Sequence, residues 1–193
     1  MRLKMKDFVL LALLTALYII VYFVAMMIIS LMGPFGHAIS PGVCGLLSGA
    51  ILIFISRKIG KMWQFTLMEL IIMGVFALMG AGYLPWFITS MIGAVLADLI
   101  ASTSSKPSVL KVAIASGLIH VGNALGGIIP ACFFAEQYMN EWIARGQKPD
   151  QMLEMVKATQ GVMGILGTVI TFVLSAIGVY IGYSILKGHL KEN

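Results

Sequence analysis

Charged side chains are scarce in this sequence. Asp, Glu, Lys and Arg make up 11% of its 193 residues, whereas a soluble domain carries about 25%. Hydrophobic residues account for 60%, and the mean hydropathy is +0.98. This composition excludes an ordinary soluble domain and indicates an integral membrane protein. The length suits a single domain, residues 1–193, with about six spans of roughly 20 residues each.

Cysteine is rarer still. The two thiols, Cys44 and Cys132, each lie in or next to an apolar run. Two isolated cysteines provide neither a disulfide framework nor the ligand spacing of a metal site. The chain also lacks a Gly-x-x-x-x-Gly-Lys-Ser/Thr loop and the His-Glu-x-x-His and Gly-x-Ser-x-Gly motifs. It therefore carries no ATP-binding loop of that kind and no common signature of hydrolysis within the membrane. We expect no metal site, no cofactor of its own and no enzymatic activity.

The apolar runs predict an all-α integral membrane protein, a bundle of six transmembrane helices. The second run is short, so we expect its helix to recruit residues from Ser40 onward, with Pro41 in the first turn. Uncharged stretches rich in turn-forming residues, 33–42 and 80–85, connect spans on one side. The predicted spans cover about 8–31, 43–55, 63–79, 86–100, 112–134 and 161–186.

Residues 135–160, before the last span, form the longest connection and carry charges of both signs. Tyr138 and Trp142 share one apolar face, and Met152 and Val156 share another. We therefore expect two short amphipathic helices that lie on the bundle or in the membrane interface. The alternative is a plain surface loop.

Basic residues are distributed unevenly between the two sides of the predicted bundle. Three of them, Arg145, Lys148 and Lys157, fall on one side. By the positive-inside rule the other side is cytoplasmic, and it holds both termini of a multi-pass protein of the cell membrane. Lipid headgroups account for the net charge of +5, so no nucleic-acid partner is expected. The ten basic residues on the cytoplasmic side are Arg2, Lys4, Lys6, Arg57, Lys58, Lys61, Lys106, Lys111, Lys187 and Lys191.

The fifth span contains His120 and Asn123, which share a helix face because they are three residues apart. Gly122 and Gly126 leave a small face that another helix or a ligand can approach closely. A His and an Asn at this depth are costly unless they face the protein interior. Two interpretations remain open: a polar pair that joins two helices, or one wall of a pocket.

Glu69 and Asp98 are the two acidic residues within the predicted spans. Intramembrane acids are candidates for functional roles. The structural alternative for Glu69 is a protonated carboxyl, or one bonded to a Ser or Thr of a neighbouring span. Asp98 lies at a cytoplasmic helix end, where an ion pair with Lys106 or Lys111 is the favoured interpretation.

Aromatic, amide and imidazole side chains gather toward the outer side of the predicted bundle. Such groups around a glycine-lined cavity are typical of a site that orients a small molecule. An aromatic belt at the lipid headgroups would explain Tyr83 and Trp86 equally well. The candidate substrate-binding residues are His37, Tyr83, Trp86, His120, Asn123 and Gln160.

Three segments carry a family resemblance: Lys4-Met5-Lys6-Asp7-Phe8, the pair Ala12-x-x-x-Ala16, and Ala97-Asp98-Leu99-Ile100. They are similar to motifs of the Trep_Strep (MptD-type) proteins. With its predicted spans and without an energising motif, the whole chain resembles the S-component, which is the substrate-binding subunit of an energy-coupling factor (ECF) transporter.

The resemblance implies a bacterial membrane protein that captures a micronutrient from outside and works with a transmembrane T-subunit and two ATPase subunits. Ala12 and Ala16 match the small-residue pair that contacts the T-subunit in this class. Outer loops of the class close over the substrate; here these are the segments around His37, around Tyr83, and 135–160. The alternatives are a self-contained carrier or channel, and a small membrane enzyme.

The residues of the outer side limit which chemical classes of ligand can bind there. That side is poor in cations, so a multiply charged anion would lack partners there. A largely apolar, ring-containing, vitamin-like micronutrient fits better. Two histidines and many methionines also suit a metal-bearing tetrapyrrole as the transported ligand, since His and Met are its usual axial ligands on proteins.

The predicted topology can be tested by cysteine labelling in intact cells, starting from a variant that lacks the two native thiols. A cysteine at Lys58 or Lys106 is expected to be shielded from a membrane-impermeant reagent, because both positions are assigned to the cytoplasm. A cysteine at Lys148 is expected to react. Labelling of the Lys58 position from outside would contradict the six-span topology.

Overall fold

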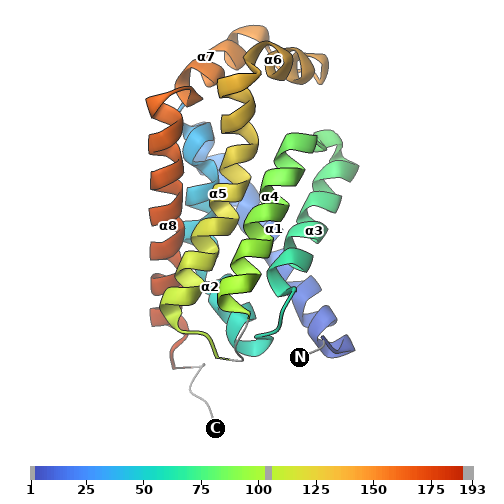
Figure 1. The fold of residues 1–193 in the computed structure, drawn as a ribbon, viewed down its shortest axis with the longest axis vertical. Helices are drawn as coiled ribbons and strands as arrows, with labels where there is room; N and C mark the ends of the chain where they lie inside the picture. Colours follow the sequence, from blue (N-terminus) through green and yellow to red (C-terminus); the bar gives the residue numbers. More distant parts are fainter. Residues whose placement is uncertain (1–2, 103–105, 189–193) are drawn as a thin grey trace.

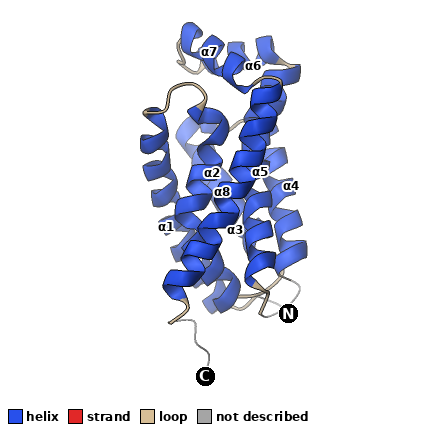
Figure 2. Ribbon diagram, turned by 90° about the vertical axis from the view of Figure 1, so that its left-hand side faces the viewer, coloured by secondary structure: helices blue, strands red, loops and turns tan. Residues whose placement is uncertain are grey.

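The computed structural model describes residues 3–102 and 106–188, which form a bundle of long helices with two short helices across one end (Figure 1). Within these described ranges every regular element is helical (Figure 2). The elements are α1 (Met5–Ser30), α2 (Gly36–Lys58), α3 (Gln64–Phe76), the π-helical turn η1 (Ala77–Ala81), α4 (Leu84–Ala101), α5 (Val109–Phe133), α6 (Ala135–Ala144), α7 (Pro149–Thr159) and α8 (Val162–Leu186).

Six helical segments of the described chain are long and apolar enough to cross a membrane, and the third of them joins α3 to η1 as Gln64–Ala81. The prediction of an all-α, six-span membrane protein is therefore confirmed. Figure 1 shows that α1 begins and α8 ends at the same end of the bundle. An even number of spans requires this arrangement, and the assignment of that end to the cytoplasm stays a prediction.

The connection before α8 forms the two amphipathic helices expected from its sequence, α6 and α7. They lie across the end of the bundle opposite to the start of α1 (Figure 1). Tyr138 is buried on α6, and Met152 and Val156 are buried on α7, so the predicted apolar faces are the ones that pack. Pro149 in the first turn of α7 has the backbone angle of a helix start, and Asp150 beside it compensates the helix dipole.

The prediction for the second span was wrong at its start. The helix begins at Gly36 rather than near Ser40 and includes His37 and Pro41, so most of the expected uncharged loop 33–42 is helical. Pro41 has no N–H and cannot donate to the carbonyl of His37, four residues earlier. The Ser40 hydroxyl donates to that carbonyl instead, at 3.1 Å. This local substitute allows the helix to pass through a proline that reads as a turn in the sequence.

α2 and α8 pack backbone against backbone. A Cβ added at Gly49 would collide with the Gly178 backbone, and one added at Gly182 would collide with the Ala50 backbone. A Cβ added at Gly45 would collide with the Ser175 side chain. Lipid supplies no hydrophobic force between helices, so such close van der Waals contact between small residues is what holds membrane helices together. We call this contact the glycine seam.

The small face of α5 is also used as predicted, since another helix approaches it. Gly122 lies against Thr89 and Gly93 of α4, and Gly126 lies against the Trp86 backbone and ring. α5 therefore contacts α4 with one face, while its opposite side lies near α8, where Ser116 Oγ donates to the Ser175 carbonyl at 3.2 Å.

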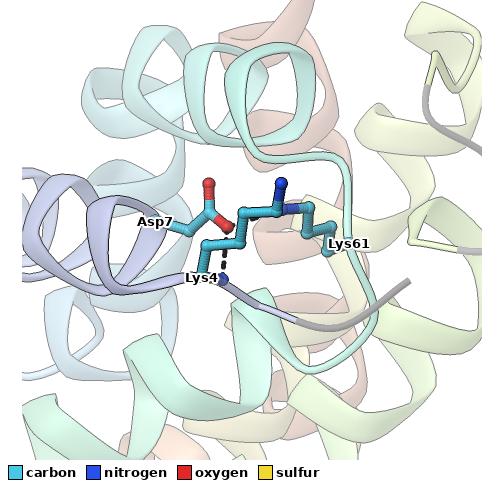
Figure 3. A network of polar contacts seen from close by, with 3 residues as sticks. All are labelled: Lys4, Asp7 and Lys61. Atoms are coloured by element: carbon cyan, nitrogen blue, oxygen red, sulfur yellow. Dashed lines mark hydrogen bonds and ion pairs between the residues drawn. The ribbon is translucent and has the colours of Figure 1, made fainter.

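The first turn of α1 is fixed to the turn between α2 and α3 (Figure 3). The buried Asp7 carboxylate accepts the Lys4 backbone N–H at 2.6 Å and the Lys61 ammonium at 2.5 Å. The first contact supplies a partner to one of the free N–H groups of the helix start, and a carboxylate there also compensates the helix dipole. The second holds α1 in place beside the inner helices.

The glycine seam predicts a sharp difference between two glycine-to-alanine substitutions. Gly49→Ala is expected to destabilise the protein by about 1–3 kcal/mol, because the added methyl group forces α2 and α8 apart. Gly74→Ala on α3 meets no atom within 4 Å and is expected to be neutral or to stabilise the helix by up to about 1 kcal/mol. Equilibrium unfolding in mixed micelles measures both; equal stability of the two variants would exclude the seam as a main source of stability.

Candidate functional site

A pocket of about 710 Å³ lies beneath α6 and α7, at the end of the bundle assigned to the outside. Its walls come from the outer ends of α1, α2, α3, α4 and α5, from η1, and from α6 and α7. No residue of α8 lines it, so the pocket lies on the side of α2 and α5 away from the glycine seam. Volumes of about 300–1,000 Å³ are typical of sites for small molecules.

Seven aromatic side chains line this pocket, and we call them the aromatic wall. Phe76 links its inner part, with ring centroids 4.9 Å from Tyr22 and 5.4 Å from Trp86. Tyr83 links its outer part, with centroids 5.6 Å from Tyr138 and 5.8 Å from Trp142. The aromatic wall consists of Tyr22, Phe23, Phe76, Tyr83, Trp86, Tyr138 and Trp142.

Arg145, at the end of α6, fixes that helix over the pocket. Its guanidinium donates to the Gly82 carbonyl at 2.7 Å and to Glu141 at 2.5 Å, and it lies 5.1 Å from the Trp142 ring centroid. Burial, with a smaller effect of the Glu141 carboxylate, raises the pKa of Tyr83 to about 12 against the opposing effect of Arg145. The Tyr83 hydroxyl is therefore neutral at physiological pH and can donate a hydrogen bond.

Four of the six predicted substrate-binding residues, His37, Tyr83, Trp86 and Asn123, line the pocket. The Asn123 side chain is held in a fixed orientation. Its Oδ1 accepts hydrogen bonds from Trp86 Nε1 at 3.0 Å and from Ser90 Oγ at 3.2 Å, and its Nδ2 donates to the Ile119 carbonyl at 3.1 Å. These contacts join α4 to α5 and set the position of the Trp86 ring in the aromatic wall.

His120 does not line the pocket and is fully buried among helices. Its Nδ1 lies 2.7 Å from the Ser116 carbonyl, which can only accept, so this nitrogen carries the hydrogen. Nε2 of the neutral ring then accepts from the Tyr18 hydroxyl, 2.9 Å away. The structure therefore separates the two residues treated as a pair in the sequence: His120 joins α5 to α1, and Asn123 forms part of the pocket.

Gln160 also lies outside the pocket lining. Its Nε2 donates to the Ala131 carbonyl at 2.7 Å, near the end of α5. The contact fixes the turn between α7 and α8 to the neighbouring span, so the position of Gln160 is explained by packing of the connection rather than by a ligand.

The two intramembrane acids differ in their surroundings. The Asp98 carboxylate accepts from the backbone N–H groups of Phe65 and Thr66, from the Thr66 hydroxyl and from Ser102 Oγ, at 2.6–3.2 Å. These hydrogen bonds cap the start of α3. Glu69 is 0% exposed, and neither carboxyl oxygen has a hydrogen-bond partner, so the expected bond to a Ser or Thr does not form.

The sequence of this chain matches a known protein family. The model of the Trep_Strep family, described as a hypothetical bacterial integral membrane protein, matches residues 5–192. The chain belongs to this family. No curated protein and no solved structure matches it. The resemblance to Trep_Strep proteins drawn from the short motifs is therefore confirmed, and with the membrane spans it makes this chain a multi-pass protein of a bacterial membrane.

Part of the pocket of this Trep_Strep protein escaped the sequence analysis. Tyr138 and Trp142 were recognised as an apolar face of a short helix but not as pocket residues, although an aromatic face on a capping helix was a usable signal. Tyr22, Phe23 and Phe76 gave none, because aromatic residues in apolar spans are ordinary lipid or core residues. Their role depends on the convergence of α1 and the end of α3, which no local pattern shows.

The geometry of His120 predicts a structural effect for Tyr18→Phe. The substitution leaves His120 Nε2 without a donor in an apolar interior, which is expected to lower the free energy of unfolding by about 1–3 kcal/mol. Tyr180→Phe removes the hydroxyl of an exposed tyrosine on α8 and is expected to change stability little. Unfolding in mixed micelles compares the two; an unchanged stability for Tyr18→Phe would contradict a structural role of this hydrogen bond.

Proposed function

We propose that this protein is the substrate-binding S-component of an ECF-type importer, which captures a small molecule from outside and delivers it with a T-subunit and two ATPases. The observation that carries the proposal is the pocket at the outer end, roofed by α6 and α7 and lined by fixed aromatic and amide groups. A site roofed on the outside suits capture from the surroundings. The chain has no ATP-binding loop, so release toward the cytoplasm needs an energising partner.

The surface of α1 supports the proposed contact with a T-subunit. Ala12 and Ala16 are both exposed, whereas Leu11 and Thr15 on the same stretch are buried in the bundle. The exposure of both side chains supports a contact with another protein over packing within the chain. Small residues four apart on an exposed membrane helix allow a second helix to approach closely.

The ligand we propose is a ring-containing, vitamin-like micronutrient, since the aromatic wall offers flat apolar surfaces and no Lys or Arg is among the described lining residues. A metal-bearing tetrapyrrole as cargo is less well supported than the sequence suggested. Both His120 nitrogens are engaged and this residue lies outside the pocket, so His37 would have to supply the imidazole ligand alone.

Two other functions are weaker candidates. A self-contained carrier is favoured by Glu69, because a buried carboxyl without a partner can bind and release a proton during transport. An enzyme using Glu69, Asp98 and His120 is disfavoured. Asp98 is occupied in capping α3, and His120 in joining α5 to α1, so we propose no catalytic role.

The partner contact predicts the outcome of a double substitution, Ala12→Leu with Ala16→Leu. The protein is expected to fold and to retain any small molecule that co-purifies with the parent, because neither residue is near the pocket. It is expected to lose co-purification with a T-subunit and ABC-type ATPases from the native host, since the added side chains hold two helices apart. Mass spectrometry of the purified sample measures both the bound proteins and the bound small molecule.

A matched control is Val169→Leu with Val173→Leu, four residues apart on the exposed face of α8, which is expected to leave the complex intact. If the parent purifies without any ATPase, the S-component assignment has to be abandoned. If the alanine variant retains an ATPase, the contact through α1 has to be abandoned. Misfolding of the alanine variant alone would instead place Ala12 and Ala16 in intramolecular packing.

A further inference from the structure

Charges at the outer end of the protein are sorted with respect to the pocket. The segment 135–160 holds three basic residues, Arg145, Lys148 and Lys157, and none of them lines the pocket. Of the acidic residues of the same segment, Glu154 on α7 does line it. Within the described lining, Glu154 and His37 are the acidic and basic side chains apart from the tyrosines, and no Asp, Lys or Arg is among them. The pocket is therefore bounded by a negative charge and no fixed positive one.

The Arg145 cation beside the outer part of the aromatic wall is unavailable to a ligand. The Arg145 guanidinium is occupied by the Gly82 carbonyl and the Glu141 carboxylate. It also lies over the Trp142 ring, at 5.1 Å from the centroid, which shows that this indole accepts a cation on a face. A ligand anion would find neither a free guanidinium nor an ammonium at the pocket wall.

The aromatic wall adds to the same electrostatic preference. The faces of aromatic rings carry negative potential and attract cations within about 6 Å of the centroid, most strongly at Trp and Tyr. Five of the seven rings of the wall belong to Tyr or Trp.

We propose that the pocket selects a ring compound with one positive charge, held by the Glu154 carboxylate and the aromatic wall. The inference rests on the proposed function, since it names the substrate class of the same site. It goes beyond that function by fixing the sign of the ligand charge.

Three matched two-ring probes test the charge preference at pH 8, where an ordinary histidine is neutral. They are N-methylquinolinium (cation), quinoline (neutral) and quinoline-4-carboxylate (anion), measured on the purified full-length protein by equilibrium dialysis against the same detergent without protein. The cation is expected to bind about tenfold more tightly than quinoline, the size of one ion pair and one or two cation–aromatic contacts. The anion is expected to show no saturable binding.

Glu154→Gln is expected to weaken binding of the cation severalfold and to leave binding of quinoline unchanged; the cation–aromatic contacts remain, so the cation keeps part of its advantage. Glu136→Gln makes the same chemical change in the same segment at a residue that is exposed like Glu154 but lies outside the pocket, and it is expected to change neither. Thermal unfolding of both variants checks their folding. Should Glu154→Gln fail to fold, Trp142→Phe provides the second variant, with a larger loss for N-methylquinolinium than for quinoline, because a Phe ring attracts a cation less strongly than a Trp ring.

Equal binding of the cation and quinoline, preference for the anion, or equal losses in Glu154→Gln and Glu136→Gln would overturn the proposal. Absence of saturable binding by all three probes would overturn it as well. None of these results would contradict the S-component assignment, because co-purification with a T-subunit and ATPases is measured without any probe.

Discussion

Close contact between α2 and α8 is the interaction on which the rest of the structure depends. In a bilayer the helices gain nothing from leaving lipid except van der Waals contact and hydrogen bonds. Gly49 and Gly178 provide the first by removing side chains from the crossing. With α2 and α8 in contact, α5 packs beside them through Ser116, and these helices form a rigid side. The pocket then lies on the opposite side of α2 and α5, where larger aromatic residues keep the helices apart.

Buried polar groups form hydrogen bonds between helices at three depths of the bundle. Asp98 serves the end assigned to the cytoplasm by capping α3, His120 joins α5 to α1 near the middle, and Asn123 orients Trp86 at the pocket. Each has its hydrogen-bond partners, as burial in an apolar medium requires. Glu69 is the exception among the buried carboxyl groups described, since Asp7 and Asp98 are both bonded. A buried polar group without a partner costs free energy, so Glu69 does not add to the stability of the bundle as Asp7 and Asp98 do.

Hydropathy and periodicity predicted the spans and the two capping helices, because lipid imposes long apolar helices and leaves few alternatives. The start of α2 could not be predicted, because Pro41 and its neighbouring glycines are typical of a turn. In the structure the Ser40 hydroxyl replaces the N–H that Pro41 lacks, and the helix continues. The opposite roles of His120 and Asn123 were equally hidden. Three residues on a helix differ by about 60° in direction, and here that angle separates a contact with α1 from a contact with α4.

α1 is the one helix that takes part in both proposed contacts. Its first half presents Ala12 and Ala16 outward, and its second half contributes Tyr22 and Phe23 to the aromatic wall. Ala16 and Tyr22 are about 9 Å apart along the helix axis, and the hydrogen bond from Tyr18 to His120 lies between them. Because an α-helix is stiff over this length, a ligand that shifts the wall end of α1 also shifts its alanine face. In the proposed complex, loading of the pocket would therefore change the surface of α1 that the T-subunit contacts.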